Sequence, residues 1–114
     1  MAQLGNGQTF KVLAQATATA SLATLYTVPA STSTVISKLV VCNTDTASKT
    51  FAIQVAIAGA ASAVAQYQYK DYTIAANDTL ELLQGMTLAT TDLIRIIASV
   101  TTLVSFTLYG QEFQ

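Results

Sequence analysis

The clearest pattern of hydrophobic and polar positions lies at residues 51–58. There Phe51, Ile53, Val55 and Ile57 alternate with small or polar residues. A repeat of two residues is that of a β-strand with one face against a hydrophobic core. We therefore predict a strand over residues 51–58 whose opposite face is small and flat. Less regular alternation predicts further strands at residues 9–16, 22–28, 66–74, 79–83, 93–98 and 103–109.

Residues 25–43 predict a strand, a corner and a second strand around Pro29, the only proline of the chain. A proline cannot donate a ladder hydrogen bond, so Pro29 belongs at a strand end or in a turn. The segment 34–42 that follows is almost entirely apolar, which predicts a central strand buried on both faces. Asn43 and the polar residues behind it predict a turn.

These segments amount to eight or nine short strands at a spacing of roughly 8 to 12 residues, which is typical of an all-β sandwich or barrel. The spacing leaves sandwich and barrel open, and our prediction of an antiparallel, jelly-roll-like β-sandwich also draws on the short motifs considered last. The length of 114 residues is that of one domain. Residues 1–20 are expected to form a flexible N-terminal arm or lead-in strand, and residues 21–114 the sandwich.

The composition of the chain limits the classes of partner that it can bind. Charged residues make up 10% of the chain and the net charge is −1. Scattered cations argue against nucleic acid, which needs a basic patch, and against anionic membrane surfaces. A near-neutral surface rich in Thr, Ser, Ala and Gln is poor at keeping monomers apart, so we expect much of it to contact protein. The N-terminal residues lack a basic segment followed by an apolar one, and no apolar run is long enough for a transmembrane helix. We therefore expect synthesis in a cytoplasm.

The residue types that carry chemistry are sparse. The chain has no histidine, which removes the commonest general base and the commonest metal ligand. Its single cysteine, Cys42, follows three apolar residues and is expected to be a buried, inert thiol. The carboxylates available for acid–base chemistry stand in predicted turns or on solvated strand faces: Asp71, Asp78, Glu81 and Asp92. Asn77, Asp78 and Asp92 could offer oxygens to calcium, but nothing matches a loop with ligands at fixed spacing. We expect no enzyme activity, no metal and no cofactor.

One surface segment, residues 67–72, is rich in tyrosine. Alternation along a strand predicts that Tyr67 and Tyr69 share one face, while Lys70 and Tyr72 lie on the other. Tyrosines on one face can pack at a sheet edge with their hydroxyls outward, anchor a protein interface or stack on a sugar ring. All three readings stay open at this point.

Five short motifs stand in a recognisable order. They are LYTVPA at 25–30, VVCN at 40–43, DYTIAANDT at 71–79, GMTLATTD at 85–92 and FTLYG at 106–110. In this order they resemble a family of small virion proteins of tailed bacteriophages, over roughly residues 10–113. The resemblance implies a non-enzymatic structural part of the particle with a β-sandwich fold and no catalytic residues.

Within the virion, the resemblance leaves two placements. We predict capsid decoration, as a cement protein that binds and stabilises the capsid lattice. The alternative is a tail- or baseplate-associated protein, either structural or binding host glycans through Tyr67, Tyr69 and Tyr72. We expect the chain to form a homotrimer and to bind the phage major capsid protein or tail proteins. Phe10 and Lys11 are candidate contacts of a docking arm within residues 1–20.

Overall fold

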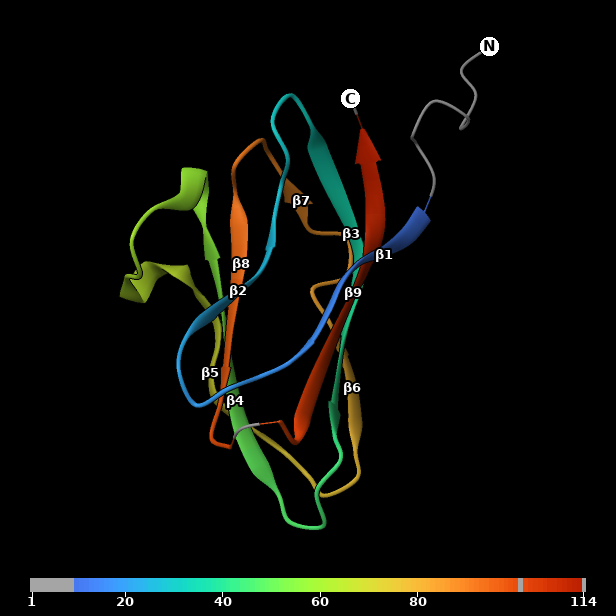
Figure 1. The fold of residues 1–114 in the computed structure, drawn as a ribbon, viewed down its shortest axis with the longest axis vertical. Helices are drawn as coiled ribbons and strands as arrows, with labels where there is room; N and C mark the ends of the chain where they lie inside the picture. Colours follow the sequence, from blue (N-terminus) through green and yellow to red (C-terminus); the bar gives the residue numbers. More distant parts are fainter. Residues whose placement is uncertain (1–9, 101, 114) are drawn as a thin grey trace.

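The computed structural model describes residues 10–100 and 102–113, which form an all-β sandwich of two antiparallel sheets (Figure 1). The strands of this part of the chain are β1 (Phe10–Thr17), β2 (Ala23–Thr27), β3 (Ser33–Asn43), β4 (Lys49–Ala56), β5 (Tyr67–Ile74), β6 (Thr79–Leu82), β7 (Thr87–Leu88), β8 (Leu93–Ala98) and β9 (Val104–Phe113). Two 3-10 turns, η1 (Ile57–Gly59) and η2 (Val64–Gln66), lie between β4 and β5. Neither these turns nor any other helix in the described part is long and apolar enough to cross a membrane.

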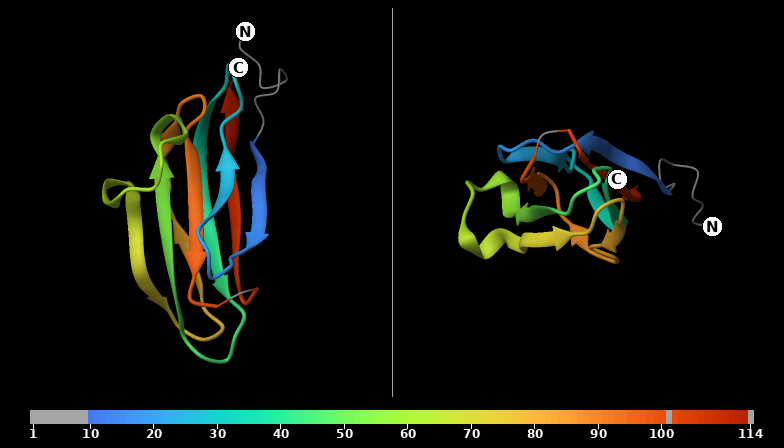
Figure 2. Two further views of the ribbon diagram at one scale, coloured as in Figure 1. Left: turned by 60° about the vertical axis from the view of Figure 1, so that its left-hand side comes forward. Right: turned by 90° about the horizontal axis from the view of Figure 1, so that it is seen from below.

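The order of the strands is that of a jelly roll, as predicted. One sheet, here the β3 sheet, has the order β1-β9-β3-β6 with β7 also beside β3, and the other, the β4 sheet, has the order β2-β8-β4-β5. The pairs are nested, because β1 pairs with β9, β2 with β8, β3 with β6 and β7, and β4 with β5. A long hairpin rolled up in this way forms the two layers seen in Figure 2.

The core lies between the sheets and takes alternate residues from both. Phe51 and Ile53 of β4 face Phe106 and Leu108 of β9, and all four are at most 2% exposed. The rings of Phe51 and Phe106 meet edge to face at 5.9 Å. Burial of each such side chain contributes about 1.5–3 kcal/mol relative to exposure, so these alternating positions stabilise the packing of one sheet on the other.

The strand β3 is central, as predicted, but it is buried on one face only. A register shift between Ile36 and Lys38 places both Ile36 and Leu39 in the core. The residues of the opposite face are partly exposed, among them Cys42. The predictions of two-sided burial and of a buried thiol are therefore wrong, because no other segment of the described chain covers this side of the β3 sheet.

The last strand is longer than predicted. The sequence reading ended it at residue 109, but β9 continues to Phe113 beside β3 and β1. Gly110 makes this possible, since a Cβ there would lie 2.4 Å from the Val35 carbonyl oxygen and 2.9 Å from Leu13 Cδ1. Of the predicted N-terminal arm, residues 1–9 lie outside the described part of the chain, while the segment from Phe10 onward forms β1.

Candidate functional site

The outer face of the β4 sheet is covered by residues 57–66, the connection between β4 and β5, which we call the 57–66 loop. Gln54 pairs with Arg95 on β8 and points away from the core, yet it is 0% exposed. Its amide donates to Ser62 Oγ at 2.9 Å and accepts from the same hydroxyl at 3.0 Å. A buried amide without partners would be costly, so this reciprocal pair fastens the loop to β4.

Arg95 holds the same loop from the neighbouring strand. Its Nη2 donates to the Ala60 carbonyl at 2.7 Å and its Nη1 to Gln66 Oε1 at 3.1 Å. Gln66 in turn donates to the Ala61 carbonyl at 2.8 Å and accepts from the Ala63 amide at 3.3 Å. Hydrogen bonds from a charged guanidinium are stronger than neutral ones, so the loop is ordered at both of its 3-10 turns.

The start of the loop is fixed by Asp92. Its carboxylate accepts from the Ala58 amide at 2.9 Å and from the Ala89 amide at 2.8 Å. Ala58 has a φ of 53°, a left-handed conformation that costs an alanine about 1–2 kcal/mol. In the sequence, Asp92 is one of the carboxylates available for acid–base chemistry. In the structure it accepts hydrogen bonds from backbone amides of two turns.

The loop presents apolar side chains to solvent. Ile57 is 76% exposed and Val64 is 84% exposed, and no residue from 57 to 66 is charged. The loop projects beside β5 on the side of the sandwich away from β1 (Figures 1 and 2). The prediction that Ile57 continues the core face is wrong, because β4 ends at Ala56 and the chain turns there. The predicted flat face of β4 is buried instead of open.

A second apolar surface lies on the outer face of the β3 sheet. Phe10 is 66% exposed and Val12 is 51% exposed, and Val12 pairs with Tyr109 of β9. Together with Lys11, Ser37, Lys38 and Gly110 these residues line a groove of about 340 Å³, which we call the β1 groove. The two candidate docking residues of the sequence reading, Phe10 and Lys11, both belong to it.

Both lysines of the β1 groove have carboxylate partners. Lys11 Nζ lies 3.1 Å from Glu112 Oε1, and Lys38 Nζ lies 3.2 Å from Glu81 Oε2. Lys38 also lies over the ring of Tyr109, 5.6 Å from its centre. The groove is therefore apolar with paired charges at its rim.

Glu112 connects the groove to the interior through Tyr26. The Tyr26 hydroxyl crosses from the β4 sheet to donate to Glu112 Oε2 at 2.5 Å, and it lies 3.0 Å from Thr34 Oγ1. Burial, followed by the hydrogen bond to Glu112, raises the pKa of Tyr26 to about 12. The tyrosine hydroxyl first and Lys11 second hold the pKa of Glu112 below its usual range. This group joins the two sheets beneath the groove.

The tyrosine segment does not form the predicted face. Tyr67 lies opposite Gln54 and Tyr69 opposite Ile53, so a register shift turns these two tyrosines to different faces of the β4 sheet. Lys70 lies beside Tyr67, with Nζ 5.3 Å from the ring centre. The prediction that Tyr67 and Tyr69 share a face is therefore wrong.

Tyr69 and Tyr72 are brought together instead. Asp71 between them has a φ of 49°, and the extra residue turns Tyr72 inward, opposite Phe51. The two tyrosine rings lie 5.3 Å apart, and each also contacts the Phe51 ring. Tyr69 packs against the core while Tyr72 stays 46% exposed. No sequence signal marks these bulges, because Lys70 and Asp71 are also compatible with a regular strand.

The carboxylates named from the sequence lie apart. Asp78 accepts from the Thr79 amide at 2.9 Å, and Glu81 pairs with Lys38 at the groove. Asp71 pairs with Lys70 at 3.2 Å. Within residues 10–100 and 102–113, no three residues of the metal-ligating types come together. Each of these carboxylates thus has a partner of its own in the fold.

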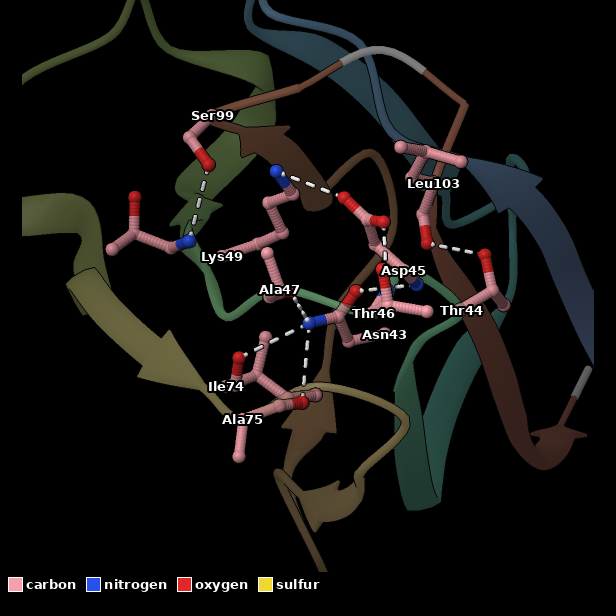
Figure 3. Close-up of polar contacts among 11 residues, drawn as sticks. Asn43, Thr44, Asp45, Thr46, Ala47, Lys49, Ile74, Ala75, Ser99 and Leu103 are labelled. Carbon is pink, nitrogen blue, oxygen red and sulfur yellow. Dashed lines mark hydrogen bonds and ion pairs between the residues drawn. The ribbon is translucent and has the colours of Figure 1, made fainter.

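A buried asparagine closes one end of the sandwich (Figure 3). Asn43 is 0% exposed, and its amide nitrogen donates to the carbonyls of Ala47, Ile74 and Ala75 at 3.0, 3.2 and 3.1 Å. Its amide oxygen accepts from the Asp45 amide at 3.0 Å. The sequence reading placed a turn here but missed this role, although an asparagine directly after an apolar strand is a usable signal.

Four of the five motifs quoted for the phage resemblance meet at the two ends of the sandwich, while the fifth, at 106–110, lies within β9. Asn43 joins the VVCN motif to the DYTIAANDT motif at one end. At the other end Thr90 Oγ1 donates to the Pro29 carbonyl at 3.1 Å, and the Val28 amide donates to the Asp92 carbonyl at 2.9 Å. These four motifs therefore encode turn and end contacts of the fold. No family model, curated protein or solved structure matches this chain.

Proposed function

We propose that the chain is a structural protein of a tailed-phage virion that decorates the capsid lattice. The observation that carries this proposal is the uncharged 57–66 loop, which the fold holds rigidly while Ile57 and Val64 stay exposed. Ordered apolar side chains at a surface are typical of protein interaction sites. The order of the five sequence motifs directs this general conclusion to virion proteins.

The architecture supports the same proposal. Jelly rolls are a common architecture of viral capsid proteins, although they also occur in unrelated proteins. In the proposed role the chain forms a homotrimer and contacts the major capsid protein. The 57–66 loop and the β1 groove supply the protein contacts, and Phe10 and Lys11 belong to the second of these surfaces.

A second candidate is a tail-associated module that binds host glycans. It is favoured by a groove of about 510 Å³ between β5 and β6, where Gln68, Glu81 and Gln84 offer polar groups beside Tyr69. Jelly rolls are also lectin folds. A glycan array run with the wild type and with Gln84→Ala tests it, and a signal that the variant loses would favour this candidate over decoration.

Immunogold labelling of intact particles tests the main proposal. Decoration predicts gold spread evenly over the heads, and particles lacking the protein should burst more readily on heating. Gold confined to the tail would move the proposal to the tail-associated candidate. Particles that carry no gold, from a phage whose lysate contains the protein, would contradict a surface role in the virion.

A further inference from the structure

We propose that copies of this chain assemble head to tail, with the 57–66 loop of one copy docked in the β1 groove of the next. The inference rests on the self-association included in the proposed function and names the surfaces that would carry it. Among the described residues the exposed large hydrophobic side chains are Phe10, Val12, Ile57, Val64 and Tyr72. Four of these five belong to the loop or to the groove, so exposed apolar side chains gather at these two surfaces.

The 57–66 loop is already ordered by hydrogen bonds before any partner binds. Its backbone is held by Arg95 on β8 and by Asp92 in the turn before β8, and Gln54 on β4 bonds the Ser62 side chain. Binding through a segment that is already ordered avoids the entropy cost of ordering it. The anchoring polar groups face the sheet, while Ile57 and Val64 are left to solvent. The fold therefore presents two apolar side chains in a fixed arrangement.

The lining and the charges of the groove suit an uncharged, apolar loop. It is concave, and Phe10, Val12 and Tyr109 contribute apolar surface to it. Its lysines are paired with Glu112 and Glu81, so an uncharged loop can cover it without leaving an unpaired charge, which would be costly. A charged segment would gain less here, because the rim charges already have partners.

The positions of the two surfaces favour a contact between copies. The loop projects on the side of the β4 sheet, whereas the N-terminal end of β1 lies on the opposite side of the sandwich (Figures 1 and 2). The loop cannot reach the groove of its own chain. A contact between two different surfaces repeats from copy to copy and closes into a ring when the rotation permits, and a ring of three fits the proposed homotrimer.

Light scattering after gel filtration, at high micromolar concentration, tests the assembly. We expect the wild type to have the mass of a closed ring, with Ile57→Asp and Val12→Asp each reducing it to one chain. Tyr72→Asp is the matched control, because Tyr72 is exposed but belongs to neither surface, and it should leave the mass unchanged. Circular dichroism confirms that each variant is folded. A monomeric wild type, or a ring that survives either charged variant, would overturn the inference.

Cysteine trapping tests which surfaces meet. In a Cys42→Ser background, chains carrying Val12→Cys are mixed with chains carrying Val64→Cys and mildly oxidised. Head-to-tail assembly predicts that the mixed disulfide dominates. Dominance of either like-with-like product would show a two-fold contact and overturn the proposal. A ring that never labels particles would leave this inference standing and remove the proposed function, whereas a monomer that labels heads would do the reverse.

Discussion

The outer faces of the two sheets differ in whether another segment of the described chain covers them. On the β4 sheet, Gln54 and Arg95 point outward and the 57–66 loop folds over them, so that polar groups are buried and apolar groups are displayed. On the β3 sheet no segment of the described chain covers the corresponding face, and the β1 groove stays open. On the β4 sheet, then, the hydrogen bonds of Gln54 and Arg95 hold the 57–66 loop in a position that exposes its apolar side chains.

The largest expected effect is on the open face. Gly110→Ala places a Cβ 2.4 Å from the Val35 carbonyl oxygen, inside the pairing of β9 with β3. We expect the free energy of unfolding to fall by about 3 kcal/mol, the upper part of the range for overpacking. Urea denaturation measures it.

Gly85→Ala is the matched control for that substitution. Gly85 has a positive φ of 78°, which Gly110 does not, and no atom lies within 4 Å of a Cβ placed there. Only the backbone penalty of about 1–2 kcal/mol remains. Since Gly110 has no such penalty, a loss for Gly110→Ala that does not exceed the loss for Gly85→Ala would contradict the expected size of the steric effect.

The next effect is on the covered face. Gln54→Ala removes both hydrogen bonds to Ser62 and leaves a space beneath the loop. We expect a loss of about 2 kcal/mol, as for a buried hydrogen-bonding group deleted without replacement. Hydrogen exchange at residues 57–66 should accelerate while exchange in β3 and β9 changes little.

Gln68→Ala is the control, because Gln68 is an exposed glutamine on β5. It should change the free energy of unfolding by less than about 0.5 kcal/mol. If loop exchange were the same in Gln54→Ala and in the wild type, the anchoring role of Gln54 would be refuted.

The third prediction concerns how stability depends on pH through Tyr26 and Glu112, whose hydrogen bond joins the two sheets. The pKa of Glu112 is lowered in the folded state, so its stabilisation is present above the unfolded value of about 4.3 and is lost as the pH falls through the folded pKa. The pKa of Tyr26 is raised to about 12, so its stabilisation is complete below about 10 and is lost above that value.

Stability should therefore be flat between about pH 5 and pH 9 as far as these two groups are concerned. Tyr26→Phe should flatten the alkaline loss and shrink the acid loss, since it removes the hydrogen bond that favours ionised Glu112. Thermal melts between pH 3 and pH 11 measure both arms. Tyr109→Phe, which changes a tyrosine outside this group, is the control and should keep the wild-type profile.

The sequence predicted the strands of an all-β domain because a two-residue repeat is read directly from side chains such as Phe51 and Ile53, and the order of the five motifs favoured a sandwich over a barrel. It could not show the cover on β4, because Gln54 reads as an ordinary exposed position until Ser62 is known to fold back on it. Nor could it show the bulges of β5, since Asp71 adopts a left-handed φ without being a glycine.

The smallest expected effect on the free energy of unfolding is at Val64, and it tests whether the exposed side chains of the 57–66 loop stabilise the fold. Val64 is 84% exposed, so Val64→Ser should change the free energy of unfolding by less than about 0.5 kcal/mol, measured by urea denaturation. The same variant should weaken self-association, because the serine replaces an apolar group at the proposed contact. Val55→Ser, on the partly buried core side of β4, should show the opposite pattern, with a clear loss of stability in the folded chain. A stability loss for Val64→Ser as large as that for Val55→Ser would mean that the loop side chains support the fold, and the contrast between a displayed and a buried apolar set would be lost.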